Sequence, residues 1–65
     1  MEKFKERLIL EYRNLIEKIN SLEITVYGNK NNDIPKEHME LLERQLKPMY
    51  EYREILEERI LLLMK

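Results

Sequence analysis

The chain has very few of the residues that break regular structure or cross-link small folds. It contains no cysteine and a single histidine, His38, which argues against disulfides and against a zinc site within one chain. One glycine and two prolines among 65 residues leave little scope for a fold with many turns. Ser21 is the only serine, and the single histidine lies far from it along the chain, so we expect no enzyme and no cofactor.

The sequence also lacks a charge bias and a long apolar run. Its 12 basic and 13 acidic residues are interleaved, and the absence of a basic patch argues against binding to DNA or RNA. No apolar run approaches the roughly 18 residues of a membrane span, and the first residues lack the features of a signal peptide. We therefore expect a soluble cytoplasmic protein that binds neither nucleic acid nor membrane.

Two segments, about residues 2–26 and 34–64, have the apolar spacing of long amphipathic helices. Apolar residues recur every three or four positions, which is the seam that one helix buries against another. Only Arg53 breaks the pattern. The first seam consists of Phe4, Leu8, Tyr12, Leu15, Ile19, Leu22 and Val26, and the second of Met39, Leu42, Leu46, Met49, Arg53, Leu56, Ile60 and Leu63.

The segment between them, about residues 27–33, reads as a loop. Gly28 is expected to take the left-handed conformation that closes a helix, and Asp33 to cap the start of the second helix. Pro48 either kinks the second helix or splits it, and we predict a kink because both of its stripes continue in phase through the proline. The predicted fold is an all-α antiparallel two-helix hairpin that forms a single domain, residues 1–65.

A second stripe beside the seam of the second helix suggests that hairpins associate. A chain of this size is marginal alone, and its C-terminal segment, Ile60–Met64, is apolar on every side. We therefore predict a homo-oligomer, a dimeric four-helix bundle or larger. The second stripe consists of Leu41, Gln45, Pro48, Tyr52, Ile55, Arg59 and Leu62.

The polar members of these stripes are candidates for a ligand site between subunits. Guanidinium groups suit phosphate, an aromatic ring suits a base, an amide suits a base edge and a carboxylate suits ribose hydroxyls. Two alternatives stay open: a buried polar layer that sets the register of the helices, and contact with a macromolecular partner. The candidate ligand-binding residues are Arg7, Glu11, Tyr12, Gln45, Tyr52, Arg53 and Arg59.

A resemblance to a known family rests on two helical patterns. The second segment reads Leu41-Leu42-x-Arg44-Gln45-Leu46-x-x-Met49-x-x-Tyr52-x-x-Ile55-Leu56-x-x-Arg59-Ile60, and the first carries Arg7, Glu11, Leu15, Lys18, Ile19 and Leu22. This pattern resembles a family of small helical phage proteins typified by one first named in a crAss-like phage. The likeness runs from about Phe4 to Leu63, with departures at Pro48 and at Tyr27-Gly28.

A further likeness of architecture is to the anti-CBASS and Thoeris anti-defence sponges of phages. These small helical hairpins oligomerise and trap nucleotide second messengers between subunits. The segment Glu11–Leu15 is similar to their Tyr-Arg-x-Leu start, whereas their Arg-Ala-Val ending is absent. The resemblance implies a protein that sequesters a cyclic nucleotide signal in the cytoplasm of an infected bacterium. The alternatives are a helical module that inhibits a host protein and a purely structural oligomer.

Overall fold

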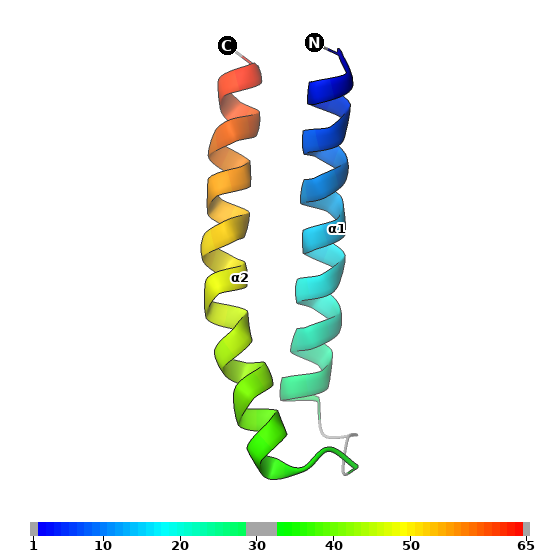
Figure 1. The fold of residues 1–65 in the computed structure, drawn as a ribbon, viewed down its shortest axis with the longest axis vertical. Coiled ribbons are helices and arrows are strands. Elements are labelled where there is room, and N and C mark those ends of the chain that lie inside the picture. Colours follow the sequence, from blue (N-terminus) through cyan, green and yellow to red (C-terminus); the bar gives the residue numbers. More distant parts are fainter. Residues whose placement is uncertain (1, 29–32, 65) are drawn as a thin grey trace.

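Two long antiparallel helices lie side by side in the computed structural model, which describes residues 2–28 and 33–64 (Figure 1). Helix α1 spans Glu2–Tyr27 and helix α2 spans Lys36–Leu63. The pair is about 45 Å long and 16 by 14 Å across, and α1 starts at the end where α2 finishes. The predicted all-α hairpin is confirmed.

The core lies along the contact between α1 and α2, where the sequence places its two apolar seams. Five side chains are buried: Leu8, Leu15 and Ile19 from α1, and Leu46 and Leu56 from α2. Their spacing puts each of them on the face that meets the other helix. Partly buried residues extend this core along the hairpin, namely Tyr12, Leu22, Val26, Met49, Tyr50, Ile60 and Leu63.

The end of α1 differs from the prediction for Gly28. Its backbone N–H donates a hydrogen bond to the Ile24 carbonyl oxygen at 2.9 Å, but its φ is not positive. The expected left-handed closure is therefore wrong. A glycine is still required, because a Cβ atom at this position would lie only 2.3 Å from the Ile24 oxygen. The predicted loop of about residues 27–33 lies partly outside the described residues, since 29–32 are not among them.

The start of α2 also differs from the prediction, which made Asp33 the cap. Pro35 occupies the cap position with φ −56° and ψ 145°, and no side chain bonds to the first turn. The Met39 N–H donates instead to the Pro35 carbonyl oxygen at 2.9 Å. A proline disfavours helical backbone at the residue before it, and Pro35 is itself extended. The helix therefore begins at Lys36, too far along the chain for Asp33 to cap it.

Pro48 does not divide α2, which runs through it as one helix. The axis of α2 bends between its green and yellow parts in Figure 1, in the region of the helix that includes the proline. A proline within a helix removes one backbone donor and pushes on the carbonyl four residues earlier, which accounts for a bend. The alternative of two separate helices is excluded.

The second stripe of α2 remains largely uncovered by α1. Leu41, Ile55 and Leu62 are each more than half exposed, and the side chains of Gln45 and Pro48 are exposed as well. Only the guanidinium-bearing Arg59 is half-buried. A single hairpin therefore presents an apolar stripe with polar insertions along the whole length of α2.

Candidate functional site

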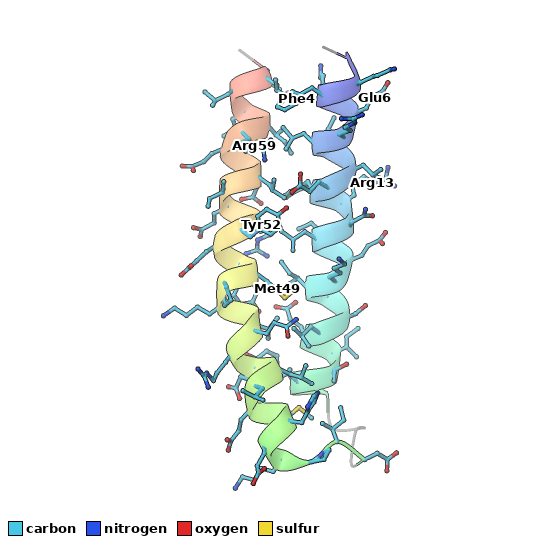
Figure 2. All side chains as sticks on the ribbon, viewed as in Figure 1. Phe4, Glu6, Arg13, Met49, Tyr52 and Arg59 are labelled. Atoms are coloured by element: carbon cyan, nitrogen blue, oxygen red, sulfur yellow. The ribbon has the colours of Figure 1, made fainter. Side chains whose placement is uncertain are left out.

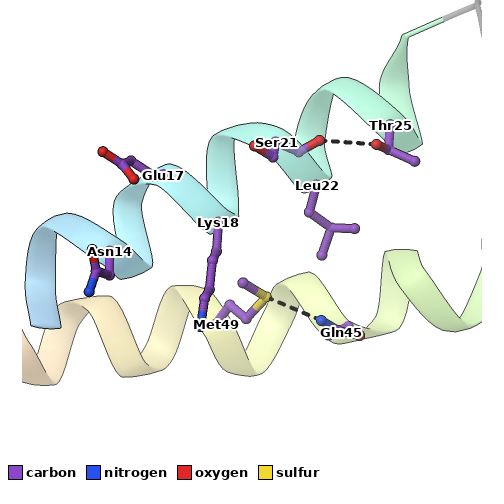
Figure 3. A pocket seen from close by; sticks show the side chains of 8 residues that line it. All are labelled: Asn14, Glu17, Lys18, Ser21, Leu22, Thr25, Gln45 and Met49. Carbon is purple, nitrogen blue, oxygen red and sulfur yellow. Dashed lines mark hydrogen bonds between the residues drawn. The ribbon is translucent and has the colours of Figure 1, made fainter.

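Two adjoining hollows lie between α1 and α2 on one side of the hairpin. The first, about 570 Å³ in volume, is lined by Asn14, Glu17, Lys18, Ser21, Leu22, Thr25, Gln45 and Met49 (Figure 3). The second, about 330 Å³, is lined by Arg7, Leu10, Glu11, Asn14, Leu15, Lys18 and Tyr52. Because they share Asn14 and Lys18, the two hollows form one continuous groove, which we call the open groove.

The position of the open groove follows from helical periodicity. Residues 7, 11, 14, 18, 21 and 25 of α1 are spaced by four, three, four, three and four, so they form a stripe along one edge of the buried seam. Gln45 and Tyr52, two turns apart, form the opposing edge on α2. The groove is therefore the boundary between the core and solvent on this side of the hairpin.

Six of the eight side chains that line the first hollow are polar, and the other two are Leu22 and Met49. The Gln45 side-chain amide donates to the sulfur of Met49 at 3.7 Å, and the Thr25 hydroxyl donates to the Ser21 carbonyl oxygen at 3.1 Å (Figure 3). Lys18 extends from α1 toward α2 beside Met49. The groove is thus bridged near its middle by a flexible cation.

The second hollow places cations, a carboxylate and the aromatic ring of Tyr52 close together, and the Tyr52 side chain is 39% exposed. Arg7 and Lys18 supply positive charge, and Glu11 supplies one carboxylate. This hollow therefore carries a net positive charge, whereas Lys18 and Glu17 balance each other in the first hollow. An anionic ligand with an aromatic group is better suited to the second hollow.

The opposite side of the hairpin is fastened by two reciprocal hydrogen bonds between the helices. The Tyr12 hydroxyl donates to the Glu57 carboxylate at 2.8 Å, and the Tyr50 hydroxyl donates to the Glu23 carboxylate at 2.5 Å. Tyr50 and Tyr52 are about 200° apart around α2, so they belong to different sides. The two tyrosine–glutamate pairs therefore close the side on which the open groove does not lie.

These bonds change the acidity of both phenols. The hydrogen bond to Glu57 is the main cause that raises the pKa of Tyr12, followed by desolvation and by repulsion from the same carboxylate. The hydrogen bond to Glu23 likewise raises the pKa of Tyr50 to about 12. In both cases the bond requires the neutral phenol as donor, and a phenolate would face a carboxylate directly.

The structure divides the seven predicted site residues into three groups. Arg7, Glu11 and Tyr52 line the second hollow, and Gln45 lines the first. Two others lie toward the fastened side: Tyr12 is bonded to Glu57, and the Arg53 guanidinium is 5.1 Å from the centre of the Tyr50 ring. The last, Arg59, is stacked over the ring of Phe4 at 5.8 Å, near the end of the hairpin (Figure 2).

Asn14 and Lys18 are central to the open groove but were not among the predicted site residues. Their signal in the sequence is positional, since they continue the stripe of Arg7 and Glu11 at the same spacing. The prediction concentrated on α2, where polar residues interrupt apolar stripes. On α1 the same stripe is mostly polar and looks like an ordinary solvated surface.

The structure describes the side chains of residues 3–28 and 33–64. Within these residues, histidine, aspartate and glutamate side chains form no cluster of three that would hold a metal ion. The same residues include no helix with both the length and the apolar character needed to cross a membrane.

The fold and the open groove define a small helical-hairpin protein with a groove between its helices that both polar and apolar side chains line. The family described as Sequestin matches residues 2–62, so the chain belongs to the Sequestin family. The name of the family is consistent with sequestering a ligand, and membership is consistent with the likeness to anti-defence sponges. No curated protein and no solved structure matches the chain. The assignment to relatives in crAss-like phages stays a prediction.

Proposed function

We propose that this protein is a non-enzymatic phage accessory protein that binds and sequesters a nucleotide immune signal in the cytoplasm of the infected host. The signal would be of the cyclic oligonucleotide or cyclic ADP-ribose type. The observation that carries the proposal is that Arg7, Glu11 and Tyr52 line the same hollow. A guanidinium donates paired hydrogen bonds to phosphate, a carboxylate accepts from ribose hydroxyls, and a phenol ring stacks on a base.

The lining of the groove favours capture over conversion. Ser21 and Thr25 are its aliphatic hydroxyl side chains, Tyr52 adds a phenol, and neither histidine nor cysteine lines either hollow. A hydroxyl needs an adjacent base to act as a nucleophile. A bound signal is therefore expected to be held and recovered chemically unchanged. Protection of the phage would then require one binding site for each molecule of signal that is captured.

A second copy of the chain is proposed to complete the site. Ligand pockets bury about 70–90% of the ligand surface, whereas both hollows of the open groove face solvent. Tyr52 joins the groove to the uncovered stripe of α2, on which Leu41, Ile55 and Leu62 are 54–67% exposed. Association along this stripe would bury apolar surface and cover the outer side of a bound nucleotide in one step.

Ligand binding is tested by thermal unfolding with a panel of cyclic dinucleotides, cyclic trinucleotides and cyclic ADP-ribose isomers. A ligand at about 100 times its Kd stabilises a protein by about 2.7 kcal/mol. For a domain of this size, that corresponds to a rise of about 10–20 °C in Tm. Tyr52→Ala should abolish the shift, and Tyr27→Ala is the control because Tyr27 is exposed but lines neither hollow. A shift below about 1 °C with every ligand would reject the proposal.

Assembly is tested separately by sedimentation equilibrium of the protein without ligand. The wild type should exceed the 8.1 kDa of one chain, and Ile55→Glu should return it to that mass. Ile24→Glu is the matched control, because Ile24 is 71% exposed on α1, away from the α2 stripe. A folded wild type of one-chain mass at high concentration would remove the second copy from the proposal.

A second candidate function follows from the same uncovered stripe. An amphipathic helix with exposed apolar side chains can dock into a groove of another protein, so the hairpin would inhibit a host protein by binding it. This function predicts that a host protein is retained from lysate after nuclease treatment and is lost with Ile55→Glu. Recovery of a nucleotide in place of a protein would favour the first proposal.

A further inference from the structure

The uncovered stripe of α2 repeats every seven residues, which is the repeat of a coiled-coil seam. Leu41, Ile55 and Leu62 are 54–67% exposed, and the exposed Pro48 belongs to the same series. A seam with this repeat packs along its whole length only against a helix with a matching apolar stripe. The question is which helix of a second copy provides that match.

Helix α1 does not offer a matching stripe. Its aliphatic side chains that are more than half exposed, Leu10 and Ile24, are fourteen residues apart, and the exposed Glu17 lies halfway between them. Packing against this face of α1 would bury a carboxylate in an apolar contact without a partner, which is costly. The second copy is therefore expected to present its own α2.

The polar members of the stripe distinguish a parallel pair of α2 helices from an antiparallel pair. In a parallel pair each residue meets its own copy, so Arg59 would face the partner's Arg59, a contact between like charges. In an antiparallel pair with full overlap, Lys36–Leu63 is centred at about residue 50, and residues equally far before and after this centre meet. No two polar side chains of the stripe then meet. The contacts between subunits are Leu41 with Arg59, Gln45 with Ile55, and Pro48 with Tyr52.

The charges beside the stripe also favour the antiparallel pair. Arg44, Glu51 and Glu58 repeat every seven residues and are exposed, and none has an ion pair or a hydrogen bond among the residues that the structure describes. In the antiparallel pair Arg44 and the partner's Glu58 are six and eight residues from the centre, an offset of about 3 Å that these long side chains span. Two such ion pairs form in each dimer, against one contact between the two copies of Glu51. Charges in this position set the orientation of paired helices.

We infer that two copies pair through their α2 helices in antiparallel orientation, about a two-fold axis near residue 50, and that Arg44 and Glu58 set this orientation through two symmetric ion pairs. The inference rests on the proposed function, to which it adds the geometry of the second copy. Gln45 and Tyr52 lie on the side of the stripe that faces α1, and a two-fold axis across antiparallel helices brings each side against the same side of the partner. Both open grooves therefore lie on one face of the pair, with Pro48 of the partner subunit beside Tyr52 at the edge of each groove.

The ion pairs are tested by sedimentation equilibrium at low salt, where surface charges act most strongly. Arg44→Glu and Glu58→Arg should each raise the Kd of the dimer by about tenfold, because each change turns both ion pairs into contacts between like charges. The double variant exchanges the charges and should return Kd to within about threefold of the wild type. Lys47→Glu and Glu54→Arg are matched controls on exposed positions about 100° around α2 from the stripe, and should leave Kd unchanged.

The orientation is tested by cross-linking of single-cysteine variants, since the chain has no cysteine of its own. Glu51→Cys lies at the axis and should join two copies through a short bismaleimide cross-linker. Arg44→Cys alone should not, because its two copies would be about 21 Å apart, which is fourteen residues along a helix. A mixture of Arg44→Cys and Glu58→Cys should be joined. In a parallel pair, Arg44→Cys alone would be joined as readily as Glu51→Cys.

The outcomes separate this inference from the proposed function. Efficient cross-linking of Arg44→Cys alone, or equal Kd values for Arg44→Glu and Lys47→Glu, would overturn the inference and leave association along the stripe in place. A wild type of one-chain mass would overturn both the inference and the second copy, whereas ligand binding is decided by thermal unfolding and not by these measurements. Cross-linking of Glu51→Cys and of the mixture, together with recovery of Kd in the double variant, would support the antiparallel pair.

Discussion

Truncation of Leu56 should show that the buried seam contributes more to stability than the apolar surface that a single hairpin leaves exposed. Leu56 is 0% exposed, and Leu61 on the same helix is 61% exposed. Replacing a leucine by alanine removes three carbons, or about 2.4 kcal/mol at roughly 0.8 kcal/mol per buried CH₂ group. The cavity left behind brings the cost at Leu56 to about 2.7–5 kcal/mol.

Leu61→Ala is the matched control for this truncation. The chemical change is the same and both positions are in α2, so the difference in helix propensity between leucine and alanine cancels. Only about two-fifths of the Leu61 side chain is removed from water, so its loss should cost about 1 kcal/mol or less. The expected difference between the variants is therefore at least about 1.5 kcal/mol.

Thermal unfolding followed by circular dichroism at a protein concentration where Tm no longer depends on concentration measures this difference. For a domain of this length, 1.5 kcal/mol corresponds to about 6 °C or more in Tm. Equal losses in Leu56→Ala and Leu61→Ala would refute the assignment of the core to the contact between α1 and α2. A Leu61 effect that appears only at high concentration would instead report association.

Three further predictions concern local features of the hairpin. Gly28→Ala should lower the free energy of unfolding by about 1–3 kcal/mol in urea titrations, because the added Cβ would lie 2.3 Å from the Ile24 oxygen; an unchanged midpoint would contradict the need for glycine. Pro48→Ala should stabilise α2 by about 1–3 kcal/mol in the same titration, because it restores a backbone donor at an exposed position, and a loss of stability would show that the bend is required. The hydrogen bond from Tyr50 to Glu23 raises the pKa of Tyr50 to about 12, so its contribution to stability is complete below pH 10, the ordinary pKa of tyrosine, and is lost between pH 10 and 12. Absorbance titration of the phenolate should show this pKa falling toward 10 in Glu23→Ala, and an unmoved pKa would exclude Glu23 as the cause.

The helical seams were predictable because burial follows spacing. Leu46 and Leu56 were placed in the core by the three- and four-residue steps alone, and both are buried in the structure. The ends of the helices were less predictable. Glycine and aspartate are common at helix ends, which is why Gly28 and Asp33 were given these roles. In the structure, the backbone at Pro35 sets the start of α2, and the close approach of the Ile24 oxygen requires glycine at position 28.

The candidate site was predictable only in part, because a polar residue at the edge of a seam can face either the open groove or the opposite side of the hairpin. Tyr12 is a member of the first seam and Tyr52 lies beside the second, yet Tyr12 is bonded to Glu57 while Tyr52 lines the open groove. Which side a residue occupies depends on how the two helices are rotated against each other, and that rotation involves residues far apart in the chain. Lys18 was missed for the same reason, since only the position of α2 turns its surface stripe into the edge of a groove.

The antiparallel arrangement has a consequence for how specificity changes among related hairpins. Because α1 starts where α2 ends, the partial positive charge of one helix terminus lies beside the partial negative charge of the other, and the two macrodipoles largely cancel. The open groove begins at Arg7, beyond the first turn of α1, so unbonded backbone amides at the helix start do not line it. Any anion in the groove must be recognised by side chains alone. Exchanges at a few surface positions would then give a new ligand preference while the backbone and the buried seam stay as they are.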